Sequence, residues 1–172
     1  VQEILDLGLH AFAMSRFAGV WAGMKTIQEI VESSATAMID PDRVKIILPE
    51  DFVMPPGGLH MRWPDAALDQ EARLFDYKWY AALAYVRANK LNHNVIASRN
   101  DRYGIIASGK AYNDTRQALN ALGLDDDSCR RLGVRLPERS HLLSGPIMEI
   151  IVATRRDVDV AKALTVSVSD SE

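Results

Sequence analysis

Apolar residues recur at helical spacing at the start of the chain, and this pattern predicts a first helix over residues 2–16. A second, shorter helical pattern covers residues 27–35, with Ile27, Ile30 and Val31 on one face. Between them, the β-branched and aromatic residues that follow Gly19 favour a short strand over residues 19–27.

The run from Val44 to Leu48 is almost wholly apolar, as in a strand that is covered on both faces, and Pro49 ends it. Residues 49–64 follow, with four of the seven prolines and two adjacent glycines. No periodic element survives that density of breakers. We therefore expect a long loop, which serves either a function or a connection between two units.

The strongest helical pattern covers residues 66–89, after a candidate N-cap at Asp65. One face carries Leu68, Ala72, Phe75, Trp79, Leu83 and Val86, and further tyrosines lie outside that stripe. A stripe this wide needs cover on more than one side. We therefore expect some apolar surface to stay exposed and, if the chain is a fragment, self-association or weak cooperativity on unfolding.

The second half of the chain alternates short strand and helix patterns. Strands are expected at residues 92–98 and 101–109, and again at 147–154. A helix is expected over residues 114–122, closed by Gly123, and Ser128 is a candidate cap for a further short helix. Residues 167–172 look like a frayed end.

The stretch from Gly104 to Ala111 has the spacing of a phosphate-binding P-loop without its closing Ser or Thr. Ile105 and Ile106 stand where the phosphate-wrapping loop would be, and two successive isoleucines favour a buried strand. The sequence therefore predicts a strand, a tight turn at Ser108–Gly109 and a helix that begins near residues 112–114, rather than nucleotide hydrolysis.

Composition and charge are ordinary for a globular protein. The 172 residues carry a formal net charge of -3, which gives no electrostatic case for nucleic acid or an anionic membrane as a partner. The single cysteine, Cys129, excludes an internal disulfide and a self-contained iron–sulfur cluster or multi-cysteine zinc site. Cysteine usage fits a reducing compartment, and we expect a cytoplasmic location.

Several blocks of sequence resemble one enzyme family. The segment "RYGIIASGKAYNDTRQALNALGL" resembles the opening of the transketolase-C-terminal-like domain of 2-oxoacid:ferredoxin oxidoreductases. The blocks "LDLGLHAFAMSRFAGVWAGMKTIQEIVESSA", "DPDRVKIILPEDFVMPPGGLHMRWPD" and "QEARLFDYKWYAALAYVRANKLN" look like the long, fused indolepyruvate ferredoxin oxidoreductases of proteobacteria. The resemblance covers about residues 1–135 and fades after Leu136.

This resemblance implies an α/β fold with mostly parallel open sheets and covering helices. Residues 1–48 would be the tail of a thiamine-diphosphate pyrimidine-binding domain, and 49–98 a connector loop and helix. Residues 99–136 would start a transketolase-C-terminal-like domain, and 137–172 would form a divergent tail.

The implied reaction is the oxidative decarboxylation of an aryl pyruvate to an acyl-CoA, with electrons passed to ferredoxin. The family uses thiamine diphosphate, Mg²⁺ and iron–sulfur clusters, but the cluster cysteines and the GDG…N diphosphate motif are missing here. The run from Gly123 to Asp127 is instead a helix-end turn. We therefore expect a fragment that binds no cofactor alone and is inactive without the remainder of its polypeptide.

For the complete enzyme, the resemblance implies ferredoxin and CoA as partners and a homo-oligomer. The alternative interpretation of the chain is a non-enzymatic α/β scaffold or interaction module. No catalytic or metal-binding residue stands out in the sequence.

Three residues are weak candidates for lining a cleft. His60 could shuttle a proton and Arg62 could hold a carboxylate, although both also fit a solvated loop. Lys110 lies at the carboxyl end of a strand and could meet a phosphate of CoA, although a solvated turn lysine explains it as well. His10 and Cys129 fit plain packing roles better than chemical ones.

Overall fold

The computed structural model describes residues 1–24, 26–60, 62–107, 109–138 and 151–153. It divides into two compact units, Val1–Asn89 and Lys90–Glu172. Within the described ranges, no helix has both the length and the apolar character that crossing a bilayer requires.

The first unit is built from helices. Helix α1 spans Gln2–Ala18, α2 spans Gln28–Val31, and α3 (Ala67–Arg73), the π-helical turn η1 (Leu74–Lys78) and α4 (Trp79–Ala88) follow one another without a break. The two long helical predictions and the loop over 49–64 are thus confirmed, while 27–35 shrinks to four residues.

The core of this unit lies where α1 packs against α4. Helix α1 contributes His10, Met14 and Ala18, and α4 buries every residue from Ala81 to Val86. Leu59 of the long loop is also buried. At the end of α1, Gly19 has a φ of 66°, and a Cβ there would come within 2.0 Å of the Leu59 carbonyl oxygen. Glycine therefore permits both the turn and this close approach.

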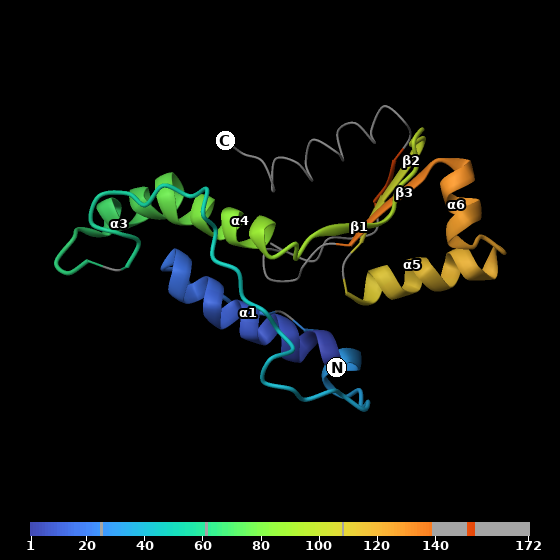
Figure 1. Ribbon diagram of the computed structural model, residues 1–172, viewed down its shortest axis with the longest axis horizontal. Coiled ribbons are helices and arrows are strands. Elements are labelled where there is room, and N and C mark those ends of the chain that lie inside the picture. Colours follow the sequence, from blue (N-terminus) through green and yellow to red (C-terminus); the bar gives the residue numbers. More distant parts are fainter. Residues whose placement is uncertain (25, 61, 108, 139–150, 154–172) are drawn as a thin grey trace. The chain divides into compact units, whose positions relative to one another are not determined.

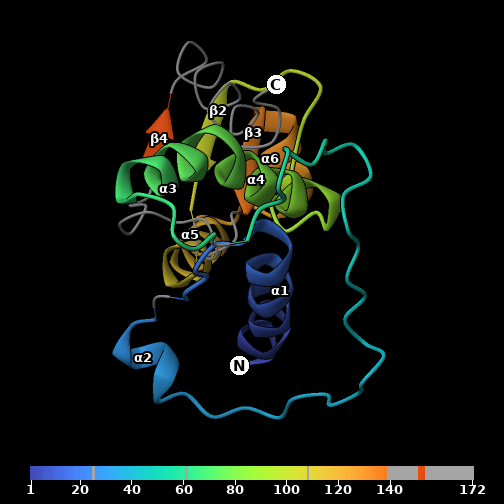
Figure 2. The ribbon, with the colours of Figure 1, turned by 90° about the vertical axis from the view of Figure 1, so that its left-hand side faces the viewer.

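Two predicted strands of this unit do not form. Residues 20–24 and 45–49 carry no regular structure, and Figure 2 shows the connection from α2 to α3 without a strand. Trp21 is fully exposed, and Ile46, Ile47 and Leu48 are 44%, 54% and 56% exposed. A strand needs a neighbouring backbone, and none is described beside these apolar segments.

The predicted apolar face of the 66–89 helix is correct only in its second half. Leu83 and Val86 are buried, but Leu68, Phe75 and Trp79 are exposed. The inward side of the first half carries Gln70, Arg73 and Lys78 instead, which donate hydrogen bonds to the carbonyls of Asp65, Gly58 and Gly19. The expected exposed apolar surface is therefore present on this helix.

The N-cap prediction at Asp65 is wrong. Ala66 occupies the cap position of α3 without a side-chain hydrogen bond. The Asp65 carboxylate pairs with Nε of Arg62 at 2.8 Å, so it is engaged by the loop rather than by the helix.

The second unit is a small mixed α/β fold. Its strands β1 (His93–Ile96), β2 (Tyr103–Ile106), β3 (Val134–Glu138) and β4 (Ile151–Ala153) form one sheet in the order β1-β3-β2-β4. Helices α5 (Lys110–Ala121) and α6 (Asp126–Leu132) lie between β2 and β3 in sequence and on one side of the sheet (Figure 1).

The sheet is not mostly parallel, which corrects the sequence prediction. Only β2 and β3 are parallel, while β1–β3 and β2–β4 are antiparallel. The parallel pair is joined by α5 and α6, which supply the long crossover that such a pair needs. Residues 97–102 between β1 and β2 are too few for a helical crossover, so β1 runs the other way.

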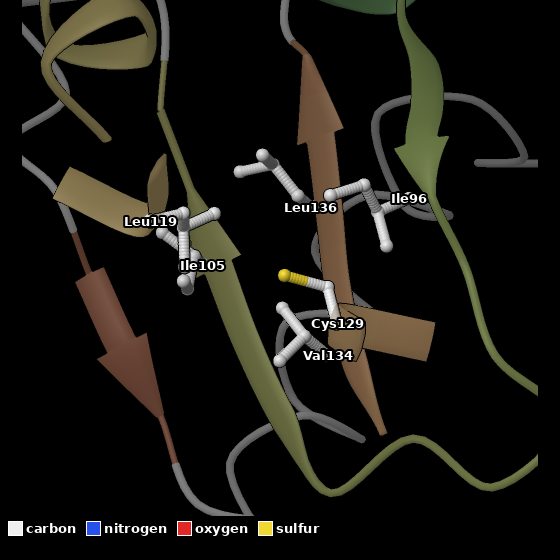
Figure 3. Packing of buried hydrophobic residues seen from close by; sticks show 6 residues of the cluster. All are labelled: Ile96, Ile105, Leu119, Cys129, Val134 and Leu136. Carbon is white, nitrogen blue, oxygen red and sulfur yellow. The ribbon is translucent and has the colours of Figure 1, made fainter. Parts of the chain in front are cut away.

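The core of this unit lies between the sheet and its two helices (Figure 3). It consists of Ile96, Ile105, Leu119, Cys129, Val134 and Leu136, all buried. Asp125, not Ser128, caps α6, because the Asp125 side chain accepts a hydrogen bond from the Ser128 amide at 2.7 Å.

Candidate functional site

The segment with P-loop spacing forms a strand, a glycine turn and a helix, as the sequence predicts. Ile105 and Ile106 belong to β2 and are 9% and 2% exposed. Gly109, with a φ of 56°, is the N-cap of α5, so the helix begins slightly earlier than expected. Ser108 lies outside the described residues. Since the isoleucines fill the core, no loop is left at their positions to wrap a phosphate.

Lys110 lies in the first turn of α5, at the carboxyl end of β2. Its Nζ donates to the Asp114 carboxylate at 2.7 Å, one helical turn along, and both side chains are about half exposed. The position matches the expectation from the sequence, but the ammonium group is engaged by its own helix. An exposed pair of this kind contributes little stability.

His60 and Arg62 lie in the long loop of the other unit. His60 is exposed, and Arg62 pairs with Asp65. The same loop contains a tight turn in which the Gly58 amide donates to the Pro55 carbonyl. Arg73 of α3 donates to the Gly58 carbonyl, so the loop is fastened to the helix that follows it.

The three cleft candidates therefore do not form one site. His60 and Arg62 belong to the first unit and Lys110 to the second. Within the described ranges, no group of three or more His, Cys, Asp or Glu side chains is placed to hold a metal ion. Lys25 and His141 lie outside these ranges.

His10 and Tyr85 form a buried pair in the first unit. His10 Nδ1 and the Tyr85 hydroxyl lie 3.0 Å apart, and the two rings meet edge to face. Burial lowers the pKa of His10 and raises the pKa of Tyr85 to about 12. The pair is therefore neutral and has a packing role, as expected for His10 from the sequence.

Cys129 is also a packing residue. It is fully buried in the core of the second unit, and burial raises the pKa of its thiol. A thiol held in its protonated form is a poor nucleophile.

A buried carboxylate that the sequence analysis missed lies between β1 and β2. The side chain of Asp101 is 1% exposed, and it accepts hydrogen bonds from the amide and hydroxyl of Ser98 and from Arg135 of β3. Burial by itself would raise the pKa of Asp101, but the Arg135 and Ser98 bonds outweigh it and hold that pKa below its usual value.

This network fixes the entry of β2 into the sheet. The Arg135 Nε lies 2.5 Å from Asp101 Oδ2, and the Gly133 carbonyl accepts from the amides of Arg102 and Tyr103. Both carboxylate oxygens of Asp101 accept hydrogen bonds within the unit, Oδ1 from Ser98 and Oδ2 from Arg135, so its role is structural. The sequence holds one local hint of this network, the three-residue spacing of Ser98 and Asp101 in a short loop. The other partner of Asp101, Arg135, is 34 positions away in sequence.

Comparison with known proteins gives one family match. The family model described as the indolepyruvate ferredoxin oxidoreductase middle domain matches residues 92–144. Neither a curated protein nor a solved structure gives a significant match. The match covers β1 to β3 with α5 and α6, and it confirms the resemblance of this region to indolepyruvate ferredoxin oxidoreductases. It continues past Leu136, so the resemblance fades later than expected, and it does not include residues 1–91.

Proposed function

We propose that this chain is part of a 2-oxoacid:ferredoxin oxidoreductase that decarboxylates an aryl pyruvate, such as indolepyruvate, to an acyl-CoA and passes the electrons to ferredoxin. The observation that carries the proposal is the match of residues 92–144 to the middle domain of such an enzyme. The strand–helix–strand unit from β2 to β3, with its buried core, supports it.

The residues of this chain do not fit the cofactors of the family. No metal-binding cluster occurs among the described side chains, and the sequence has one cysteine, which is buried. Thiamine diphosphate, Mg²⁺ and the iron–sulfur clusters would therefore be held by the remainder of the polypeptide. No catalytic step is assigned to this chain, and its role is to complete the fold of the enzyme.

In this proposal, residues 1–48 end a pyrimidine-binding domain, 49–98 connect, and the segment from 99 starts a transketolase-C-terminal-like domain. CoA, ferredoxin and a homo-oligomeric assembly belong to the complete enzyme. The purified chain alone is expected to show no turnover.

Immunodepletion tests the proposal. An antibody raised against the purified chain is used to clear an anaerobic extract of the source cells, and reduction of methyl viologen is measured with indolepyruvate, phenylpyruvate or pyruvate, each with CoA. We expect the aryl-pyruvate activity to fall in proportion to the chain removed, while pre-immune serum leaves it unchanged. Full activity after complete removal of the chain would refute the proposal and favour the interaction-module alternative.

A further inference from the structure

The helical segment of residues 67–80 has its polar side chains turned inward and its apolar side chains turned outward. Gln70, Arg73 and Lys78 donate hydrogen bonds to backbone carbonyls of their own unit. The large apolar side chains are 39–77% exposed: Leu68, Leu74, Phe75, Tyr77, Trp79 and Tyr80. An exposed apolar patch of this size, with polar groups among it, marks an interaction surface.

The exposed charges of this segment are all negative. Asp69, Glu71 and Asp76 are exposed, and none of their carboxylates has a hydrogen bond or ion pair among the described residues. The basic residues of the segment, Arg73 and Lys78, are engaged on the inward side. The outward face of residues 67–80 therefore combines apolar rings with uncompensated negative charge.

These carboxylates lie beside the apolar side chains. Glu71 and Phe75 are one helical turn apart, and so are Asp76 and Tyr80. Residues at this spacing are neighbours on a helix surface. A partner that covers the rings therefore also lies against the carboxylates, and it must carry positive charge there, because like or unpaired charges at an interface are costly.

We propose that the outward face of residues 67–80 binds a helix of another polypeptide whose apolar side is bordered by lysine or arginine. A helix fits because Leu68, Phe75 and Trp79 extend along about three turns, a length against which a second helix can pack. The aromatic rings supply the buried contact area, and the carboxylates exclude acidic partners. This inference does not depend on the proposed enzymatic function.

The same charges disfavour two other occupants. Two copies of this face would bring their carboxylates together, and like charges repel. The exposed apolar row on α1 of a second copy has Glu3 at one end and Arg16 at the other, so it offers no excess of positive charge. Helices that lie on membranes carry lysine and arginine on their polar side, whereas this segment carries carboxylates.

Fluorescence of the full chain tests the proposal. Trp21 and Trp63, which are both exposed, are replaced by Phe so that Trp79 is the reporter. The probe is a synthetic peptide of about 18 residues, with Leu at every third or fourth position and Lys elsewhere. We expect it to shift the Trp79 emission to the blue with a saturable binding curve.

Two control peptides should give no shift: one with Glu in place of Lys, and one with the same Leu and Lys residues in scrambled order. Failure of the basic peptide to bind, or equal binding by either control, would overturn the proposal.

Neutral variants test the role of the carboxylates. Asp69→Asn, Glu71→Gln and Asp76→Asn together should weaken binding of the basic peptide about tenfold. A control protein loses the same net charge at exposed positions outside the segment: Glu3→Gln, Glu29→Gln and Glu50→Gln. It should bind as the parent does. Equal weakening in both proteins would show that only total charge matters, and circular dichroism checks that both are folded.

Phe75→Ala tests the apolar part of the face and separates the other occupants. It should weaken peptide binding by at least about tenfold, because the ring loses its buried contact. A dimer in sedimentation equilibrium that Phe75→Ala dissociates would assign the face to a second copy. A blue shift with phosphatidylcholine–phosphatidylserine vesicles but not with the basic peptide would assign it to a membrane, and either result overturns the proposal.

Discussion

Apolar segments are paired and buried in one unit, but an equally apolar segment is exposed in the other. In the unit that begins at Lys90, each described strand has a backbone partner, and side chains of β1, β2 and β3 form a core against α5 and α6. In the unit from Val1 to Asn89, the equally apolar run at 46–48 has Asn89 as its hydrogen-bond partner among the described residues, and it stays exposed. Apolar sequence therefore makes a strand only where a second backbone is within reach.

The two units also differ in how many large apolar side chains they expose. Among the described residues of the second unit, the exposed large apolar side chains are Tyr103, Leu122 and Leu132. The first unit exposes many more, including Trp21 and Trp63 at 102% and 90%. Four strands complete the sheet of the second unit, whereas the helical unit keeps much of its apolar surface exposed among the described residues, as expected for the helix over 66–89.

The largest expected effect is at Gly19 in the helical unit. Gly19→Ala forces a Cβ against the Leu59 carbonyl at a positive φ, and should cost roughly 3 kcal/mol. Urea unfolding followed by tryptophan fluorescence measures it, since all three tryptophans lie in residues 1–89 and Trp79 of α4, 47% exposed, changes its surroundings on unfolding. Gly23→Ala, where a Cβ meets open space, is the control and should change little.

The matching test in the sheet unit is Asp101→Asn. The change removes a buried charge-assisted hydrogen bond to Arg135 and should cost about 2 kcal/mol at neutral pH. The folded-state pKa of Asp101 lies below its ordinary value of 3.8, so this stability is present above that value and is lost as pH falls through the folded pKa.

Unfolding from about pH 5 to about pH 2, followed by tyrosine circular dichroism, should thus be flatter in the Asn variant. Asp127→Asn, which breaks an exposed pair with Arg130, is the control and should cost no more than about 0.5 kcal/mol at neutral pH. Identical profiles for the parent and Asp101→Asn would contradict the role given to Arg135.

Mild acid should lower the stability of the helical unit before it affects the sheet unit. Burial depresses the pKa of His10 in the folded protein below its usual 6.5, so its contribution is full above that value and is lost as pH falls. The helical unit should therefore weaken as pH falls below about 6.5, before Asp101 titrates. The tryptophan-detected urea midpoint should fall over this range in the parent and stay level in His10→Gln.

A smaller loss of stability is expected at Asn89, whose side chain binds the backbone of Ile47 as a neighbouring strand would. Asn89→Ala removes both bonds to Ile47 and should cost about 1 kcal/mol, because these bonds are exposed to water. Amide hydrogen exchange should accelerate at Ile47 and leave β2 unchanged. Asn120→Ala, on the exposed side of α5, is the matched control.

The smallest effect is expected at Lys110. Lys110→Ala breaks an exposed ion pair with Asp114 and should cost no more than about 0.5 kcal/mol. ATP or GTP should not raise the melting temperature of either protein. A nucleotide-dependent rise that disappears in the variant would show that residues 104–111 bind phosphate after all.

Several features that depend on interactions between neighbouring residues were predicted correctly from the sequence. The helix over residues 2–16, the Pro/Gly loop and the β2–Gly109–α5 unit follow from periodicity and glycine turns, and the structure confirms them. The strands expected at 19–27 and 44–48 are wrong because pairing depends on distant backbone, which no window of sequence contains.

The choice of candidate site residues was limited in the same way, because their surroundings depend on other parts of the chain. His60, Arg62 and Lys110 were chosen by residue type and loop position, but their surroundings depend on Asp65 and Asp114 and on the division into units. Asp101 drew no attention because its partner Arg135 is far away in sequence.

The π-helical turn at Leu74–Lys78 gives the helix from residue 67 to residue 88 two different rotational phases. The inward side chains that donate hydrogen bonds are three residues apart from Gln70 to Arg73, but five residues apart from Arg73 to Lys78, where the chain passes through the wider π-helical turn. A single helical wheel drawn through 66–89 must therefore mislabel one half. Wide turns of this kind behave as one inserted residue, so the outward aromatic face of the first half and the buried face of the second are offset by about 100°.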